Sequence, residues 1–166
     1  EAARSVRDLW TGSAILSWLS FQAMLPVIEE LGPTALVFPA LRGTPLMDLW
    51  LQKKLGNVSE PSDDARRAPC LPNRFLALVP WGHGGADARC LADQCKQAAR
   101  ERWKQLCDAV HKDLAGRLSG YAEWDRRWDE QVDSFFEFRT AVLPLREARD
   151  DVLKELLGKD ALTNAE

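Results

Sequence analysis

Residues 9–28 form a run of twenty residues without a charged side chain, and this run constrains the fold more than any other feature. Its apolar residues surround the helix axis instead of keeping to one stripe, which predicts a helix buried on nearly every side. They are Leu9, Trp10, Ile15, Leu16, Trp18, Leu19, Phe21, Met24, Leu25, Val27 and Ile28. A helix of this kind lies between two layers of a folded domain.

A membrane span is the alternative for the same run, because its length meets the minimum for crossing a bilayer. Five polar side chains oppose this interpretation, since each would need a partner inside lipid. They are Thr11, Ser13, Ser17, Ser20 and Gln22, and Pro26 follows near the end of the run. The sequence therefore favours a buried helix of a globular domain.

Size and charge restrict the class of protein. The chain has 166 residues, of which 46% are hydrophobic, and this is enough for one substantial core. A formal net charge of −3 excludes a global basic field of the kind that drives non-specific binding to nucleic acid. The chain begins at Glu1 without a recognisable signal peptide, so we expect a piece of a longer cytoplasmic chain.

Four cysteines, Cys70, Cys90, Cys95 and Cys107, are expected to be reduced thiols in a cytoplasmic compartment. Cys90 and Cys95 are five residues apart on a predicted helix and so do not share a face. No pair with the CxxC spacing of a zinc site is present. We expect no metal site in this chain, and Cys107 is predicted to pack in a core.

The first half of the chain after the apolar run predicts two strands and a helix. Residues 35–39 are apolar and have the length of a strand, and residues 46–55 form an amphipathic helix that Pro45 can begin. Residues 56–70 are polar and rich in turn formers, which predicts a surface loop. Residues 73–79 predict a second strand.

The second half is predicted to be mainly helical. A long helix is expected over 87–118 and another over 121–132. Residues 135–142 are aromatic and β-branched, which indicates a third strand, and residues 146–159 predict a charged helix.

The order helix, strand, strand, helix, strand is that of an α+β, ferredoxin-like βαββαβ palm domain whose first strand is missing. We expect that strand just before Glu1, and both long helices on one face of an antiparallel sheet. Residues 1–145 would form this incomplete palm, and residues 146–166 a helix and tail leading to the next domain. The second apolar side of the first helix would then be exposed and available to a partner or another domain.

Two further features allow both a functional and a structural interpretation. The loop at residues 81–85 contains three glycines, but it lacks the Lys-Ser/Thr of a P-loop, so a flexible connector is favoured over a phosphate site. Trp103, Trp124 and Trp128, with nearby arginines, could stack single-stranded RNA, yet tryptophans at helical spacing more often anchor a core or an interface.

Four blocks of the sequence, taken in order, resemble the large subunit of type III-B CRISPR effector complexes. They are residues 3–17, 38–45, 71–75 and 141–145. The resemblance implies that the chain is the first of two palm domains, which together bind ATP and make cyclic oligoadenylate. It also implies that the second palm carries the metal-binding Gly-Gly-Asp-Asp, and that other subunits, guide RNA and target RNA are partners in the complex.

Neither a Gly-Gly-Asp-Asp motif nor a His-Asp pair occurs in this sequence, so we expect no catalytic residue here. ATP would be a substrate shared with the second palm, and a divalent metal would bind only there. The parent protein would be a cyclic oligoadenylate synthase, in the cytoplasm and not in a membrane. A non-catalytic scaffold domain of the same kind of complex is the alternative.

Six residues are candidates for contact with the nucleotide. Arg7 and Asp8 lie early in the first helix, where phosphate is favoured. Gly12 permits a close approach, and the Ser13 hydroxyl can bond the ligand. The Asn73 amide can read an adenine edge, and the Arg74 guanidinium can bind phosphate. Local structural roles remain open for all six: a salt bridge in the first turn, close helix packing at Gly12-Ser13, or the capping of a strand.

Overall fold

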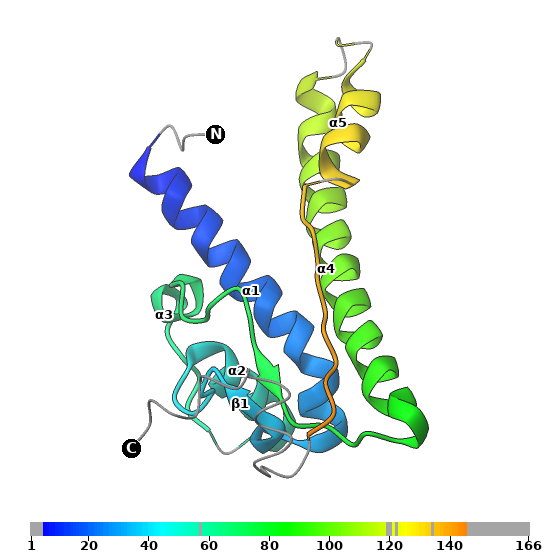
Figure 1. Cartoon of the computed structure of the whole chain (residues 1–166). Helices are drawn as coiled ribbons and strands as arrows, with labels where there is room; N and C mark the ends of the chain where they lie inside the picture. Colours follow the sequence, from blue (N-terminus) through cyan, green and yellow to red (C-terminus); the bar gives the residue numbers. More distant parts are fainter. Residues whose placement is uncertain (1–4, 57, 119–120, 122, 134, 146–166) are drawn as a thin grey trace, which may run out of the picture.

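The structure of the protein, a computed structural model, describes residues 5–56, 58–118, 121, 123–133 and 135–145. Two long helices dominate it, α1 (Val6–Leu31) and α4 (Ala86–Leu118), and they pack against each other. Figure 1 shows that they meet near the end of α1 and the beginning of α4 and diverge from there. The N-terminal half of α1 therefore lies apart from the distal half of α4.

Helix α1 is longer than the apolar run that predicted it. Ser5 caps its N-terminus, because the Ser5 Oγ accepts a hydrogen bond from the backbone N–H of Asp8 at 3.2 Å. At the other end the N–H of Gly32 donates to the carbonyl oxygen of Ile28 at 3.0 Å. Gly32 has a φ of 87°, a conformation that glycine adopts without strain.

Burial of α1 is confined to its C-terminal half. Met24 is 0% exposed and Ile28 is 2% exposed, whereas Val6 is 85% and Leu9 is 64% exposed. The expectation of a helix buried on nearly every side is therefore wrong for its first turns. The physical reason is that α4 diverges from α1, so that apolar neighbours are gathered only around the second half.

A small antiparallel sheet packs beside these helices. It consists of β1 (Leu36–Phe38) and β2 (Leu76–Ala77), and Leu36 is paired with Ala77. The N–H of Leu78 also donates to the carbonyl oxygen of Ala35 at 2.8 Å. Both predicted strands are confirmed in place, although β2 is much shorter than the predicted 73–79.

Shorter elements connect the strands and helices. The predicted helix after Pro45 is confirmed as α2 (Pro45–Leu55). The predicted surface loop contains a short helix, α3 (Asp63–Arg67), which Ser62 caps. Two single-turn 3-10 helices complete the chain path, η1 (Pro33–Ala35) and η2 (His83–Gly85).

The C-terminal part of the described chain forms an arm. Helix α5 (Trp124–Asp133) folds back on the distal half of α4, and both helices were predicted. Residues 135–145 then run in an extended conformation along α4 towards the sheet (Figure 1).

The predicted third strand at residues 135–142 is wrong within the described chain. These residues do not form a strand. A strand needs backbone hydrogen bonds to a neighbouring strand, and among the described residues no strand lies beside them. Their first aromatic side chains pack on α4 instead: Phe135 and Phe136 both contact Trp103. The α+β class is confirmed, but the described residues form a two-stranded sheet and not a ferredoxin-like one. The predicted helix at 146–159 lies outside the described residues.

Candidate functional site

The first three candidate residues lie on the exposed N-terminal part of α1. Arg7, Asp8 and Gly12 are all exposed to solvent. A Cβ atom added at Gly12 would meet no atom within 4 Å, so no described part of the chain packs closely against this glycine. These three positions are therefore open to an external ligand or partner.

Ser13 is half-buried, and its hydroxyl group is engaged within the helix. The Ser13 Oγ donates a hydrogen bond to the carbonyl oxygen of Leu9 at 2.9 Å. Its oxygen lone pairs remain able to accept from a ligand, since a hydroxyl has two acceptor positions besides its proton.

Asn73 and Arg74 lie on the segment that leads into β2. Both are exposed. Within the part of the chain that the structure describes, the side chains of Arg7, Asn73 and Arg74 make no hydrogen bond or ion pair. Three strong polar groups are thus free to bind a ligand.

The segment before Asn73 is fixed to α1 by two serines, which in the sequence are polar interruptions of an apolar helix. Ser17 is 1% exposed, and its Oγ accepts hydrogen bonds from the backbone N–H of Cys70 at 3.0 Å and of Leu71 at 2.9 Å. Ser20 donates from its Oγ to the carbonyl oxygen of Pro72 at 2.6 Å. Ser13, Ser17 and Ser20 follow the i, i+4, i+7 spacing of one helix face, and this spacing was the available signal.

The structure does not bring the six candidates into one pocket. Ser13 and Ser20 are seven residues apart, which is about 10 Å along a helix axis at ~1.5 Å per residue. Arg7 lies a further six residues towards the N-terminus. The candidates on α1 are therefore spread along and around the helix, with Arg7 and Asp8 near its N-terminus. Asn73 and Arg74 follow the segment that Ser20 holds at Pro72.

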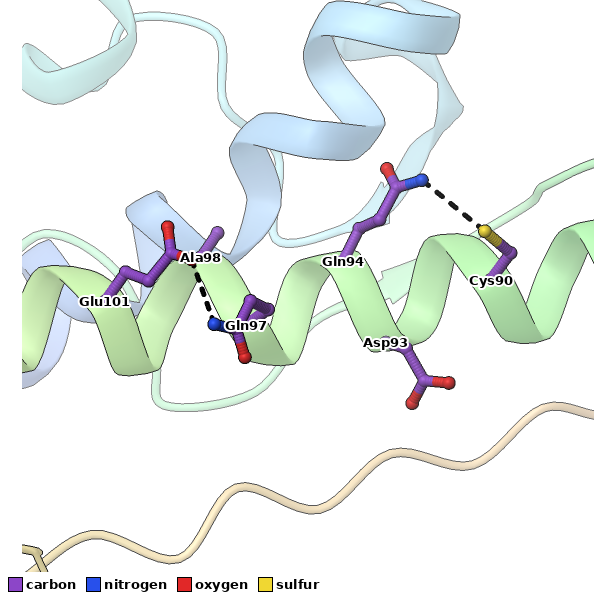
Figure 2. A pocket seen from close by; sticks show the side chains of 6 residues that line it. All are labelled: Cys90, Asp93, Gln94, Gln97, Ala98 and Glu101. Carbon is purple, nitrogen blue, oxygen red and sulfur yellow. Dashed lines mark hydrogen bonds between the residues drawn. The ribbon is translucent and has the colours of Figure 1, made fainter.

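A depression in the described surface lies elsewhere, on α4. Figure 2 shows its lining, which comes from this helix alone: Cys90, Asp93, Gln94, Gln97, Ala98 and Glu101. The amide of Gln97 donates to Glu101 at 2.9 Å, and the amide of Gln94 donates to the Cys90 Sγ at 3.5 Å. The lining contains two carboxylates and no cationic side chain, so it is poorly suited to phosphate.

The glycine-containing loop is a structured connector. Gly82, Gly84 and Gly85 all have positive φ, and the Arg89 guanidinium donates to the carbonyl oxygen of Gly84 at 2.8 Å. The Asp87 side chain lies against Gly82, which places a negative charge beside the loop. The Arg89 guanidinium and the Asp87 carboxylate thus lie on the same short loop and oppose each other in charge.

The tryptophans act as anchors between α4 and α5. His111 on α4 stacks with Trp124 at 5.8 Å between ring centroids, and Trp128 lies 5.2 Å from Trp124. The His111 Nε2 is also 2.9 Å from an Asp125 carboxylate oxygen. Both tryptophans are half-buried, and these contacts give them a structural role between α4 and α5.

The four cysteines are free. Burial raises the pKa of the Cys95 thiol from 9.0 to about 11, and hydrogen bonds with the backbone of Val27 and of Cys95 itself oppose this rise. Burial likewise raises the pKa of Cys107, and the negative charge of Asp108 adds to the effect. In the described ranges no three His, Cys, Asp or Glu side chains are grouped as a metal site would require.

Helix α1 is long and apolar enough to cross a membrane by length and composition. Its C-terminal half is buried in the core with α4 and the sheet, as expected for a core helix. Helix α1 therefore has the length and composition of a membrane span, but its C-terminal half packs as a core helix.

Comparison with known proteins identifies the region. Residues 1–108 match a family described as CRISPR-associated protein Cmr2, N-terminal. A relative from Pyrococcus furiosus, named CRISPR system Cmr subunit Cmr2, is 29% identical over 105 residues, which are 63% of this chain and 11% of the relative. No solved structure matches the chain.

The family match covers α1, the sheet and the first two thirds of α4, and it includes all six candidate residues. It ends before α5 and the fourth block of resemblance at 141–145. The chain spans only 11% of the length of the Pyrococcus relative. Because the match extends over well more than half of the residues, this chain belongs to the family of the CRISPR-associated protein Cmr2, N-terminal, as its resemblance to the large subunit of type III-B complexes predicts.

Proposed function

We propose that this chain is the part of a type III-B CRISPR effector large subunit that contributes to an ATP site between two palm domains. The observation that carries this function is the placement of Asn73 and Arg74. Both are exposed and have no partner among the described residues, directly after a segment that two hydrogen-bonding serines attach to α1. A fixed segment that ends in free polar groups is suited to hold a ligand.

The chemistry of these groups matches a nucleotide. A guanidinium group binds phosphate through paired N–H donors, and an amide can pair with the edge of adenine. Ser13 offers acceptor lone pairs, while Arg7, Asp8 and Gly12 are exposed positions in the first turns of α1. Phosphate is also favoured at the N-terminus of a helix.

Catalysis is assigned to another part of the parent protein. The chain has no Gly-Gly-Asp-Asp motif, so the divalent metal and the catalytic carboxylates belong to the second palm. In this proposal α1, α4, β1 and β2 are the framework of the first palm, within residues 1–145, and further strands come from flanking sequence. Residues 146–166 lead to the next domain, and the parent is a cyclic oligoadenylate synthase.

The proposed partners follow from the family. They are the second palm, other subunits of the effector complex, and guide and target RNA held by the complex. The proposed location is the cytoplasm, with α1 as a core helix and not a membrane span. Solubility of the complete protein without detergent is the expected result, and a requirement for detergent would contradict it.

ATP binding to the complete protein that contains this chain tests the nucleotide role. Arg74→Ala is expected to weaken ATP binding about tenfold or more in equilibrium dialysis, because a hydrogen bond to a charged phosphate is lost. Asn73→Ala is expected to weaken it about three- to tenfold, because its hydrogen bond is to the neutral adenine edge. Arg100→Ala is the matched control, since Arg100 is an exposed arginine on α4 and not one of the six candidate residues. Unchanged binding in both site variants would refute the assignment.

A scaffold role is the second candidate, and a specific observation favours it. Leu9 is 64% exposed and Trp10 is 47% exposed, so the N-terminal half of α1 presents apolar surface of the kind that marks an interface. Leu9→Gln together with Trp10→Gln is expected to weaken assembly of the effector complex in size-exclusion chromatography. Leu55→Gln, at an equally exposed leucine on α2, is the control. Intact assembly in the double variant would exclude this surface as an interface.

A further inference from the structure

Among the described residues, all the hydrogen bonds of the Ser17 hydroxyl group are made with Cys70 and Leu71. Its oxygen accepts the N–H groups of Cys70 and Leu71 through both acceptor positions, at 3.0 and 2.9 Å. Its oxygen also lies 3.7 Å from the Cys70 Sγ, so the hydroxyl proton can be shared with the sulfur. Ser17 is 1% exposed and is the most deeply buried polar residue of the described core.

Ser20 provides a second attachment one helical turn further along α1. It donates to the carbonyl oxygen of Pro72 at 2.6 Å. Two attachment points determine both the position of residues 70–72 and their direction along the helix. The segment runs parallel to α1, from Ser17 towards Ser20.

Asn73 and Arg74 lie between two fixed points. On one side, Pro72 is held by Ser20, and on the other, Leu76 is paired with Phe38 of β1. Their own side chains have no partner among the described residues. Their placement therefore depends on the anchors at either end.

We propose that Ser17 and Ser20 are positioning residues that hold Asn73 and Arg74 in place to receive the nucleotide, an inference that rests on the function proposed above. They act through the backbone of residues 70–72 and do not touch the ligand. Ser13 lies on the same helix face but bonds only the Leu9 carbonyl oxygen of its own helix, so it does not hold the segment. We name residues 70–72 with Ser17 and Ser20 the serine latch.

The latch is tested first without nucleotide, by hydrogen exchange of the complete protein. Ser17→Ala removes the acceptor of two backbone N–H groups, so the amides of Cys70 and Leu71 are expected to exchange about five- to tenfold faster. The core amides of α1 and α4 should be unaffected. Ser13→Ala is the matched control and should leave the amides at 70 and 71 unchanged.

Nucleotide affinity is then measured in the same variants. Ser17→Ala and Ser20→Ala are each expected to weaken ATP binding about fivefold, since each loses hydrogen bonds that hold residues 70–72. Ser20→Thr keeps the hydroxyl group and should retain the affinity of the wild type. Arg74→Ala added to Ser17→Ala should cost less than Arg74→Ala alone, because residues that act through one another are not additive. A merely structural role would lower the melting temperature without this non-additivity.

The experiments distinguish a failure of the positioning role from a failure of the nucleotide function. If Arg74→Ala weakens ATP binding but Ser17→Ala and Ser20→Ala do not, the latch has no positioning role while the nucleotide function stands. If Arg74→Ala and Asn73→Ala leave ATP binding unchanged, the nucleotide function fails and the positioning role fails with it. If Ser17→Ala does not fold, Ser20→Ala decides between these outcomes, since it removes one bond to a carbonyl oxygen and leaves both N–H groups paired.

Discussion

Trp103 of α4 donates its indole N–H to the carbonyl oxygen of Val132 at 3.1 Å, and this bond joins the end of α5 to the middle of α4. The same indole stacks with Phe135 at 5.5 Å and meets Phe136 edge-on at 4.7 Å between ring centroids. One side chain thus holds both the end of the helical arm and the start of the extended segment. Trp103 lies within the region that matches the family, whereas its partners lie outside it.

Replacing Trp103 separates its hydrogen bond from its aromatic contacts. Trp103→Phe keeps an aromatic ring and loses the indole N–H, so the arm should lose about 1 kcal/mol of stability. Trp103→Ala also loses the packing and should cost about 3 kcal/mol or more. Limited proteolysis between α5 and residue 145 checks both values, and equal protection in the wild type and Trp103→Ala would contradict the anchoring role.

Substitutions in the C-terminal half of α1 should lower stability far more than substitutions in its N-terminal half. Met24 is 0% exposed, so Met24→Ala is expected to lower the free energy of unfolding by about 2 to 5 kcal/mol through lost burial and a cavity. Leu9 is 64% exposed, so Leu9→Ala should change the free energy of unfolding by no more than about 0.5 kcal/mol. Urea unfolding monitored by circular dichroism measures both. Similar losses of stability at the two positions would contradict the prediction, because they would mean that Leu9 is buried in solution.

The stability of the fold should decrease at alkaline pH because of Cys95. Burial raises the folded-state pKa of this thiol from 9.0 to about 11, so above pH 9 the unfolded chain loses a proton that the folded chain keeps. The contribution of the buried thiol is complete below pH 9 and is lost as the pH rises towards 11, by on the order of 2 to 3 kcal/mol.

Cys95→Ala supplies the control for this pH dependence. Other groups also titrate above pH 9, so the informative quantity is the difference in slope between wild type and variant in urea unfolding from pH 8 to 11. The variant should lose less stability over this interval. Parallel slopes would show that the Cys95 thiol does not titrate differently in the two states.

Thiol labelling should distinguish the cysteines by burial and by pKa. Cys90 is exposed and should react first with iodoacetamide, whereas Cys95 and Cys107 are each 5% exposed and have raised pKa values. Their thiolate forms are scarce at pH 8, so labelling should be much slower than at Cys90. Mass spectrometry of peptides gives the order, and labelling in urea, where all four should react, is the control.

Local sequence patterns predicted the elements that depend on local forces. Helices α2, α4 and α5 form where apolar periodicity and Pro45 placed them, because the periodicity of a helix and its end signals are contained in neighbouring residues. The two strands were likewise found, since their apolar runs are bounded by turn formers. The resemblance to the CRISPR large subunit also rested on short local blocks, and the family match confirms it over residues 1–108.

Long-range contacts decided the conformation of residues 135–142 and the burial of α1. Residues 135–142 have the composition of a strand, but a strand also needs a neighbour, and Trp103 provides an aromatic surface instead. The apolar pattern of α1 gave no sign that only its second half would be covered, because coverage depends on the direction in which α4 leaves the contact.

In the candidate site, too, some features follow from the local sequence and others from tertiary contacts. The sequence by itself determined a long apolar helix, two short strands, the helical arm and the polar character of Asn73 and Arg74, since these follow from side-chain chemistry and neighbouring residues. Only the tertiary structure decided that Ser17 and Ser20 hold the chain at residues 70–72, more than fifty positions away. The physical reason is that a hydroxyl group in an apolar helix must find a hydrogen-bond partner when it is buried, but its sequence does not say which one.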